Sequence, residues 1–409
     1  MIFYRVITFI IIFFLPVISI YRILKKKDTF GSLKEKIGFY SKLPKGNLIW
    51  FHGSSVGEVL SIIPLVRELE KKNDLAQILI TSNTLSSAKV LKNLKFKKTI
   101  HQFFPIDANF IVKRFLKYWK PKACIFIESE IWPNVIRNIK KQKLPLILLN
   151  ARITNKSYKR WKKINSFSNK LFSMFDLCLP QNKETFKYLK KLGSKKIKLI
   201  GNLKLCEIKE ENSKKLNSSQ MSFLRSKKVL FTGLSTHYSE ETFCTDLFLN
   251  LRRNKNEILI LIPRHVERTD LIEKDLREKK LVTHKHSSKR KINKKTDVYL
   301  VDTYGEAKKF LGLSKVIFTG GSLISHGGQN PLDAVRNNSI VIHGPSIYNF
   351  TEIYKFLSKE KMSFKFKNLN QAIKLVKNRN LNNRNTKTKL SLISQKILNK
   401  TKIELFKYV

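Results

Sequence analysis

The sequence predicts an α/β protein made of two Rossmann-like domains that face each other across a cleft. Three observations predict this class: the chain has 409 residues, its apolar content is 42%, and short apolar runs alternate with helical patterns from Asn47 onward. A chain of this length forms two domains of ordinary size. Alternating strands and helices are typical of parallel sheets, which bind ligands at the carboxyl ends of their strands.

The first half contains six candidate strands separated by helical patterns. The strands are expected at residues 48–52, 77–81, 123–128, 146–150, 177–180 and 197–200, and helices at 59–72, 108–119 and 135–141. A polar, charged stretch at residues 208–228 follows and is typical of a linker.

The same pattern restarts after this stretch. Strands are expected at residues 229–232, 258–263, 298–301, 316–319 and 340–343, and a C-terminal helix at about 389–406, near the junction of the halves. We therefore divide the chain into an N-terminal segment at 1–24, a first domain at 25–207, the linker at 208–228 and a second domain at 229–409.

The N-terminal segment is apolar. Residues 6–21 carry no charge, and Arg22 and three lysines at 25–27 follow. As a helix these residues reach only about 24 Å, less than the roughly 30 Å of a hydrocarbon core, so both a tilted anchor and a partly inserted segment fit. Because positive clusters stay on the cytoplasmic side, the chain after residue 27 is expected to be cytoplasmic.

Charge is the second large feature of the chain. It has 81 Lys and Arg against 30 Asp and Glu, a net charge of +51, which favours a polyanionic partner. The basic residues are scattered and match no nucleic-acid-binding motif, so an anionic membrane surface or a general compositional bias explains them better. The four cysteines and eight histidines show no metal-ligand spacing, and the cysteines are expected to be reduced packing residues at Cys124, Cys178, Cys206 and Cys244.

Residues 318–334, FTGGSLISHGGQNPLDA, indicate a strand that runs into a glycine-rich loop and then a helix. Asn330 and Pro331 are typical of an N-cap and a first helical position, and Asp333 falls in the first turn. Exposed N–H groups at such a helix start favour a phosphate, and a carboxylate there can accept hydrogen bonds from ribose hydroxyls. The alternative is a well-capped surface helix after a flexible loop.

Other candidate residues follow the predicted strands. Ser55 and Glu58 form either a capping box or the start of a helix that carries a general base, Glu58. Glu128 and Glu130 are two apart, so both are expected on one face of a strand end, or on a solvated edge. Arg264 is either a phosphate ligand or a surface cation. Residues 304–306 open a helix whose N–H groups suit a nucleotide, and Lys204 is the weakest candidate by itself.

Seven motifs occur in order, and together they resemble bacterial 3-deoxy-D-manno-octulosonic acid (Kdo) transferases of glycosyltransferase family 30. The motifs are SSVGE at 54–58, ESEIWPN at 128–134, NAR at 150–152, GNLK at 201–204, PRH at 263–265, YGE at 304–306 and GGQNPLDA at 327–334. The resemblance covers nearly the whole chain, including the apolar N-terminus.

This resemblance implies a GT-B glycosyltransferase that transfers Kdo from CMP-Kdo to the lipid A precursor (lipid IVA) at the cytoplasmic face of the inner membrane. It implies inversion, no metal and no cofactor. Glu58 would be the general base, and Glu128 and Lys204 would stabilise the transition state. The CMP moiety would be held by Pro263, Arg264, Tyr304, Gly305, Glu306, Asn330, Pro331, Leu332 and Asp333. The family usually has Glu at the position of Asp333. The alternatives are another GT-B enzyme that uses a nucleotide sugar and, from a different class, a basic nucleic-acid-binding protein.

Overall fold

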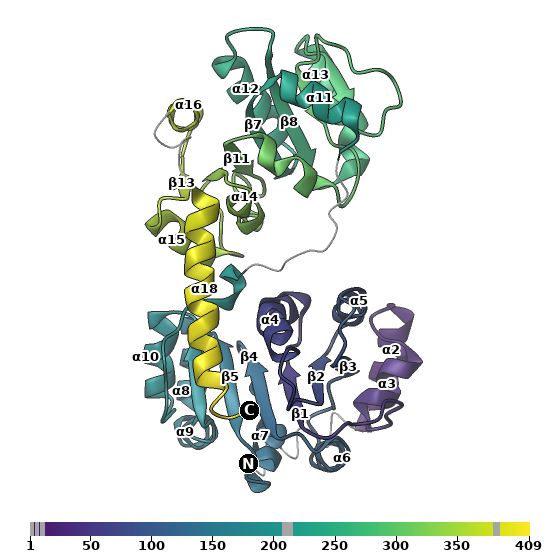
Figure 1. Cartoon of the computed structure of the whole chain (residues 1–409), viewed down its shortest axis with the longest axis vertical. Helices are drawn as coiled ribbons and strands as arrows, with labels where there is room; N and C mark the ends of the chain where they lie inside the picture. The colour runs from purple at the N-terminus through teal and green to yellow at the C-terminus, as the bar shows by residue number, and fades with distance from the viewer. Residues whose placement is uncertain (1–3, 5–7, 9–12, 207–215, 379–384) are drawn as a thin grey trace. The chain divides into compact units, whose positions relative to one another are not determined.

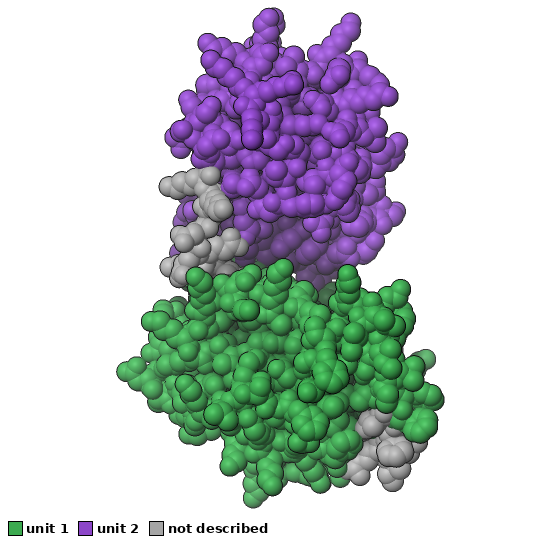
Figure 2. Space-filling view, turned by 90° about the vertical axis from the view of Figure 1, so that its right-hand side faces the viewer, with its two compact units in different colours: residues 1–209, 394–409 green, residues 210–393 purple. Residues whose placement is uncertain are grey.

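The computed structural model describes residues 4, 8, 13–206, 216–378 and 385–409 (Figure 1). The chain divides into two compact units, which Figure 2 colours separately. Unit 1 contains residues 1–209 and 394–409, and unit 2 contains residues 210–393.

Unit 1 is built on a six-stranded parallel sheet with the order β3-β2-β1-β4-β5-β6. The strands are β1 Leu48–His52, β2 Gln77–Ser82, β3 Thr99–Phe103, β4 Ala123–Ile127, β5 Leu146–Ala151 and β6 Leu177–Pro180. Every residue of β1 and β4 is buried, as expected for central strands covered on both faces. The ring centroid of Trp50 lies 4.6 Å from that of Phe115 and 5.3 Å from that of Phe126, which places an aromatic core on one face of this sheet.

The helices of this part of unit 1 lie before, between and after these strands in the chain (Figure 1). They are α2 Leu15–Leu24, α3 Phe30–Lys36, α4 Val56–Leu69, α5 Leu85–Asn93, α6 Asn109–Trp119, α7 Pro133–Lys141, α8 Asn155–Lys163, α9 Asn165–Phe172 and α10 Lys183–Lys191. A short 3₁₀ helix, η1, covers Leu203–Leu205. Helix α7 begins with Pro133 at a position where no N–H is needed, so this proline ends the preceding loop without breaking the helix.

Unit 2 contains a seven-stranded parallel sheet with the order β13-β12-β11-β7-β8-β10-β9. The strands are β7 Lys228–Thr236, β8 Glu257–Pro263, β9 Thr283–Lys285, β10 Val298–Leu300, β11 Val316–Thr319, β12 Ile340–His343 and β13 Ser363–Lys365. The helices are α11 Ser218–Ser226, α12 Glu240–Leu251, α13 Thr269–Glu278, α14 Leu332–Arg336, α15 Thr351–Lys359 and α16 Leu369–Lys377, with 3₁₀ helices η2 Val266–Arg268, η3 Ala307–Lys309 and η4 Leu311–Leu313.

The predicted strands agree with the structure wherever the sequence has a continuous apolar run. Three strands were not predicted, β3, β9 and β13, and residues 197–200 form no strand but only an isolated bridge between Ile197 and Cys178. Lysines at 196 and 198 interrupt the apolar pattern there. The predicted linker at 208–228 is also partly wrong, because Ser218–Ser226 form helix α11 with Leu224 buried. Residues 207–215 lie outside the described part of the chain.

The C-terminal helix α18, Thr386–Leu405, is shared by both units, which corrects the prediction that the second domain runs to residue 409. Near its start, the Thr386 hydroxyl donates to Val335 O across 3.0 Å, within unit 2. Further along, the Ser394 hydroxyl donates to Leu205 O across 2.7 Å, and Lys402 Nζ lies 2.8 Å from Glu68 Oε2, both within unit 1. These contacts are the reason that the last part of the helix belongs to unit 1.

Of the predicted membrane anchor at residues 1–24, the structure describes residues 4, 8 and 13–24, and the other residues lie outside the described part of the chain. Helix α2 is described, and it buries none of its residues. Val17, Ile20 and Leu24 lie on one helical face, and each exposes more than half of its surface. In the described part of the chain, no helix combines the length and the apolar character that crossing a membrane requires.

Candidate active site

Glu58 lies at the turn between β1 and α4 and does form the capping box that the sequence predicted. Its N–H donates to the Ser55 hydroxyl across 3.4 Å, and its Oε2 accepts from the N–H groups of Ser54 (2.6 Å) and Ser55 (3.3 Å). Oε2 takes both bonds, and among the described residues nothing donates to Oε1. The capping role therefore leaves one carboxylate oxygen available, so a cap and a general base are compatible.

The environment of Glu58 suits proton transfer near neutral pH. Burial, followed by the negative charges of Glu130 and Glu128, raises the pKa of Glu58 to about 7. Gly53 leaves room for this arrangement, because a Cβ there would lie only 3.1 Å from both Glu58 Cβ and Ile127 Cδ1. A carboxylate whose pKa lies near the working pH is the form that general-base catalysis favours.

Glu130 is held in place by three donors that all meet at Oε2. The Ser54 hydroxyl lies 2.6 Å away, Trp132 Nε1 2.7 Å and His52 Nε2 3.1 Å. Burial opposes the ionisation of Glu130, but the hydrogen bonds from these residues lower its pKa below the usual value. Glu130 therefore acts as a fixed negative charge beside Glu58.

Glu128 does not share a strand face with Glu130, which corrects the sequence prediction. Strand β4 ends at Ile127, and Glu128 has a φ of +58° in the left-handed region. The alternative of a solvated edge is also wrong, since the Glu128 side chain is 5% exposed and its Oε1 forms an ion pair with Lys204 Nζ. A buried carboxylate of this kind requires such a cation.

The end of β5 places Lys204 opposite Glu128. Asn150 has a φ of +51°, and its Oδ1 accepts from the Leu203 N–H across 3.0 Å, which fixes η1 against the sheet. The Arg152 N–H donates to Glu128 O across 3.1 Å. Positive φ values at non-glycine residues cost about 1–3 kcal/mol each and cluster at functional sites. Two neighbouring strand ends, those of β4 and β5, carry this strain here.

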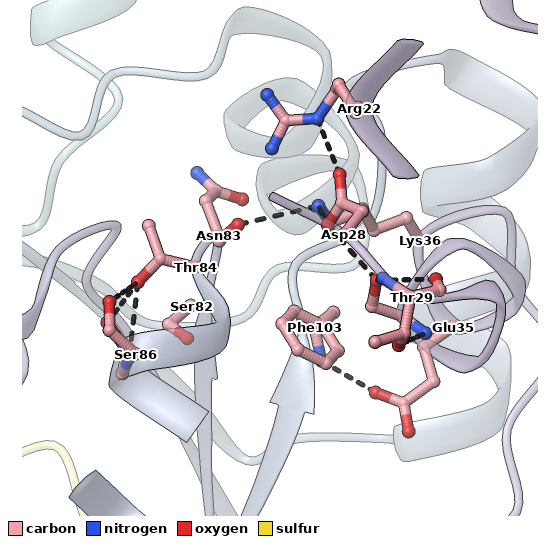
Figure 3. A network of polar contacts seen from close by, with 12 residues as sticks. Arg22, Asp28, Thr29, Glu35, Lys36, Ser82, Asn83, Thr84, Ser86 and Phe103 are labelled. Atoms are coloured by element: carbon pink, nitrogen blue, oxygen red, sulfur yellow. Dashed lines mark hydrogen bonds and ion pairs between the residues drawn. The ribbon is translucent and has the colours of Figure 1, made fainter. Parts of the chain in front are cut away.

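Ser54 is a residue of the site that the sequence did not single out. It is held by Asn83, which in turn contacts residues near the start of the chain. Asn83 donates to Ser54 through both its side-chain amide (2.7 Å to Oγ) and its N–H (3.3 Å to O). Lys36 Nζ lies 3.4 Å from Asn83 O and 2.5 Å from Asp28 Oδ1, and Asp28 also binds Arg22 across 2.5 Å. Figure 3 shows Asp28 between Arg22 and Lys36, with a dashed line from Lys36 to Asn83. Nothing in the sequence pattern pointed to this chain of contacts, because its members are far apart in sequence.

In unit 2, the residues implied for CMP binding lie after strands β8, β10 and β11, at the carboxyl edge of the sheet. Pro263 ends β8, and the exposed Arg264 follows. Tyr304 OH donates to Glu267 Oε1 across 2.7 Å, which joins the loop after β10 to the loop after β8. Gly305 has a φ of +80°, which favours glycine.

The Glu306 carboxylate is held by two side chains of unit 2. Lys309 Nζ lies 2.6 Å from Oε1, and His286 Nε2 lies 2.5 Å from Oε2. The hydrogen bond from Lys309 lowers the pKa of Glu306, against a smaller opposing effect of burial. Glu306 is therefore a charged, anchored carboxylate. It is the N-cap residue of the three-residue 3₁₀ helix η3, at the place where the sequence predicted that residues 304–306 open a helix.

The start of helix α14 is shifted by one residue from the prediction. The helix begins at Leu332, so Pro331 is the N-cap residue rather than the first helical residue. Asn330 still contributes, because its Oδ1 accepts from the Leu332 N–H across 3.1 Å. Asp333 lies in the first turn as predicted, and its Oδ1 lies 3.3 Å from Arg336 Nη1.

The glycine-rich loop after β11 uses its N–H groups in a way that the sequence did not predict. The fully buried Glu240 accepts from the N–H groups of Gly321 (2.7 Å), Ser322 (3.0 Å) and Leu323 (3.0 Å). A protein carboxylate thus occupies these three donors, whereas the phosphate was expected at the helix start near Asn330. Gly320 is required for a different reason, since a Cβ there would lie 2.1 Å from Ser235 O.

Comparisons with known proteins identify the family. Residues 31–206 match the family model described as 3-deoxy-D-manno-octulosonic-acid transferase (kdotransferase). A 3-deoxy-D-manno-octulosonic acid transferase from Haemophilus influenzae is 31% identical over 331 residues, which cover 80% of this chain and 77% of that protein. The enzyme of the same name from Rickettsia felis is 33% identical over 352 residues, 84% of this chain and 75% of that protein.

Solved structures show the same kind of fold. A putative UDP-N-acetylglucosamine 2-epimerase from Listeria monocytogenes has a TM-score of 0.55 at 12% identity, covering 89% of this chain and 98% of that one. The glycosyltransferase of kitacinnamycin has a TM-score of 0.53 at 10% identity, covering 90% and 100%. These likenesses establish two α/β domains of the GT-B type. The family model and the curated relatives show that the chain belongs to the 3-deoxy-D-manno-octulosonic acid transferase family and is a glycosyltransferase.

Proposed function

We propose that this enzyme transfers Kdo from CMP-Kdo to a hydroxyl group of the lipid A precursor in lipopolysaccharide biosynthesis, with inversion and without a metal or cofactor. The observation that carries the proposal is the state of Glu58. One of its oxygens accepts no hydrogen bond from the described residues, and its pKa is raised to about 7 by burial and by Glu130 and Glu128. These are the properties of a general base at neutral pH.

The proposed reaction is a single displacement at the anomeric carbon. The acceptor oxygen forms a bond to this carbon while Glu58 takes the hydroxyl proton. The bond from the anomeric carbon to the phosphate oxygen breaks, and CMP leaves with the electron pair. Attack from the face opposite the leaving group inverts the configuration, so a single base and no covalent intermediate are sufficient.

Residues of unit 1 and residues of unit 2 are assigned to stabilising the charge that develops in the transition state. In unit 1, Lys204 is kept in position by its ion pair with Glu128. In unit 2, Arg264 provides an exposed guanidinium whose planar fork fits a phosphate. Tyr304, in the loop after β10, and Asp333, in the first turn of α14, are assigned to the nucleoside.

We further propose that the enzyme acts at the cytoplasmic face of the inner membrane. Helix α2 exposes Val17, Ile20 and Leu24 on one face, and Arg22 and the lysines at 25–27 follow or flank that face. An apolar helical face beside cations is typical of segments that bind at the surface of anionic bilayers. A phosphorylated glycolipid acceptor is held at such a surface.

The test is a product analysis. Purified enzyme is incubated with CMP-Kdo and tetraacylated lipid A precursor, and the lipid products are analysed by mass spectrometry and NMR. We expect a mass increase of one or more Kdo residues, release of CMP, and an anomeric configuration opposite to that of the donor. Chelation of divalent cations should leave the rate unchanged. Turnover with a UDP-sugar but not with CMP-Kdo would instead establish the alternative GT-B activity.

A further inference from the structure

Three histidines of unit 2 converge at the carboxyl ends of β7, β8 and β11. The His237 ring centroid lies 4.3 Å from that of His326 and 5.6 Å from that of His265. A Cβ on Gly321 would lie 3.2 Å from His326 Cδ2 and 3.5 Å from His237 Nε2, so two of the rings lie directly over this glycine. His237 is 7% exposed, whereas His265 and His326 are exposed, which makes the cluster accessible from solvent.

The charged groups around this cluster are mainly positive. Arg264 and Arg268 both act electrostatically on His237, and Gln329 Nε2 lies 3.3 Å from His237 Nε2. The nearby carboxylates are already engaged by other groups. Glu240 accepts from backbone N–H groups, including that of His237 at 3.0 Å, Glu241 is paired with Arg268 at 3.2 Å, and Glu267 accepts from Tyr304 at 2.7 Å.

Burial, and then the neighbouring rings of His326 and His265, lower the pKa of His237 to about 4. More than one protonated ring in so small a space is unfavourable unless a negative charge is close. An anion placed against the rings would reverse this effect, because it would stabilise the protonated imidazole. Within the described residues, no group of three His, Cys, Asp or Glu side chains is arranged to hold a metal ion. The cluster is therefore suited to an anion.

We propose that His237, His265 and His326 together bind an anionic oxygen group of the sugar-nucleotide donor, and that this binding takes up a proton. This inference rests on the proposed function in one respect, which is that the donor is CMP-Kdo. This donor carries two such groups, the phosphodiester and the carboxylate of the sugar acid. Arg264, adjacent to His265 in the chain, supplies a permanent positive charge beside the same site.

The proposal predicts a pH dependence that the donor itself does not cause. A phosphodiester and a sugar-acid carboxylate both stay ionised between pH 6 and pH 8, so a change in donor KM over this range reports on the protein. Binding that takes up one proton tightens as the pH falls. Because one pKa unit corresponds to a factor of ten, we expect the donor KM to rise about 10-fold or more from pH 6 to pH 8.

The test uses His326→Phe and His265→Phe in the full-length enzyme, since both side chains are exposed and phenylalanine keeps a planar ring. In each variant, we expect the donor KM at pH 6 to rise about 10-fold and its pH dependence to weaken, because a charge-assisted hydrogen bond is lost. The kcat at saturating donor should stay within about 2-fold, since neither ring transfers the acceptor proton. Lys274→Met, which removes an exposed cation on α13, is the matched control and should leave KM unchanged.

A binding experiment then distinguishes the two anionic groups and separates this proposal from the proposed function. Calorimetry with CMP and cytidine compares ligands with and without the phosphate. A reduced preference for CMP over cytidine in the histidine variants assigns the cluster to the phosphate, and an unchanged preference together with a raised donor KM assigns it to the carboxylate. An unchanged donor KM and an unchanged CMP preference in both variants would overturn the proposal, while Kdo transfer by the parent enzyme continued.

Discussion

The N–H group of Ser54 donates to Glu58 Oε2 across 2.6 Å, while the hydroxyl of the same serine donates to Glu130 Oε2 across 2.6 Å. Ser54 thus bridges two carboxylates whose charges repel each other. This bridge holds the negative charge of Glu130 close to Glu58, and that charge is the second largest cause, after burial, of the raised pKa of Glu58. One small residue therefore sets both the position of the base and its proton affinity.

The pH profile of transfer is the first prediction. Glu58 acts as a base only when ionised, and its pKa is about 7, so kcat should fall about tenfold for each pH unit below 7 and level off above it. The rate of Kdo transfer at saturating substrates, measured from pH 5 to pH 9, tests this. A rate that stays constant from pH 5 to pH 9 would contradict a base with a pKa of about 7.

Glu58→Gln should lose nearly all transfer activity while CMP binding is retained. The amide preserves the shape of the side chain and an oxygen acceptor for Ser54, but it cannot take a proton, and loss of a general base costs about 100-fold to 10,000-fold. Single-turnover transfer and calorimetry with CMP measure the two properties. Near-normal turnover by the folded variant would leave Glu58 with its capping role alone.

The same variant should be more stable than the parent at alkaline pH. The pKa of Glu58 is raised in the folded state, so folding favours the protonated form, and the parent loses stability as the pH rises through about 7. Glutamine carries no charge and avoids this loss. We expect the Tm of Glu58→Gln to exceed that of the parent at pH 8 and the difference to be smaller at pH 5. A higher Tm of the parent at pH 8 would show that the ionised carboxylate stabilises the fold.

Lys204→Met should affect both the rate and the pH profile. Loss of Lys204 leaves the Glu128 carboxylate buried without its cation, which adds uncompensated negative charge near Glu58. The pKa of Glu58 should then rise further, so the acidic limb of the pH profile should move to higher pH and kcat at pH 7 should fall. The double variant Lys204→Met, Glu128→Gln is the control, and it should return the limb toward that of the parent. A limb that stays in place in the single variant would show that the pair of Lys204 and Glu128 does not act on Glu58.

Asp333→Ala should weaken CMP binding if this carboxylate accepts hydrogen bonds from the ribose. Such a contact is worth about 1.5–3 kcal/mol, or roughly 10-fold to 150-fold in affinity. The parent should prefer CMP to 2′-deoxy-CMP, and the variant should barely distinguish them. Because Asp333 Oδ1 lies 3.3 Å from Arg336 Nη1, Arg336→Gln is the control for loss of that pair. An unchanged ribose preference in Asp333→Ala would leave Asp333 as a partner of the helix start only.

Deletion of residues 1–21 should weaken, but not abolish, association with anionic vesicles. The truncated enzyme keeps its distributed positive charge, and it also keeps Arg22 and its ion pair with Asp28. Its remaining binding should therefore be electrostatic and should be released by added salt, unlike that of the full-length enzyme. Vesicle sedimentation over a range of salt concentrations measures this. Retention of the truncated enzyme at high salt would require a second apolar docking surface.

The sequence predicted the central strands well and the sheet edges poorly, for a physical reason. β1 and β11 are covered on both faces, so their residues form continuous apolar runs. The strands that were not predicted, β3, β9 and β13, lie at the edges of the sheets and carry polar residues such as His101 and Lys365. Their pairing depends on the neighbouring strand rather than on their own pattern.

The residues of the candidate site were likewise predicted only where the signal is local in the sequence. Glu58 and its capping box follow from local spacing, and the structure confirms that cap. Glu240 could not be found in this way, because it binds N–H groups 81 to 83 residues further along the chain. The positive φ of Glu128 and the link from Asn83 to Ser54 likewise depend on tertiary contacts.

Helix α18 has a consequence for how the protein is made. Unit 1 takes its last segment, residues 394–409, from the very end of the chain, after all of unit 2. The earlier part of unit 1 is therefore synthesised before three of its contacts can form. These contacts are Ile397 with Gly201, Ser394 with Leu205 and Lys402 with Glu68. Loss of residues 394–409 would therefore remove contacts from the unit that is translated first.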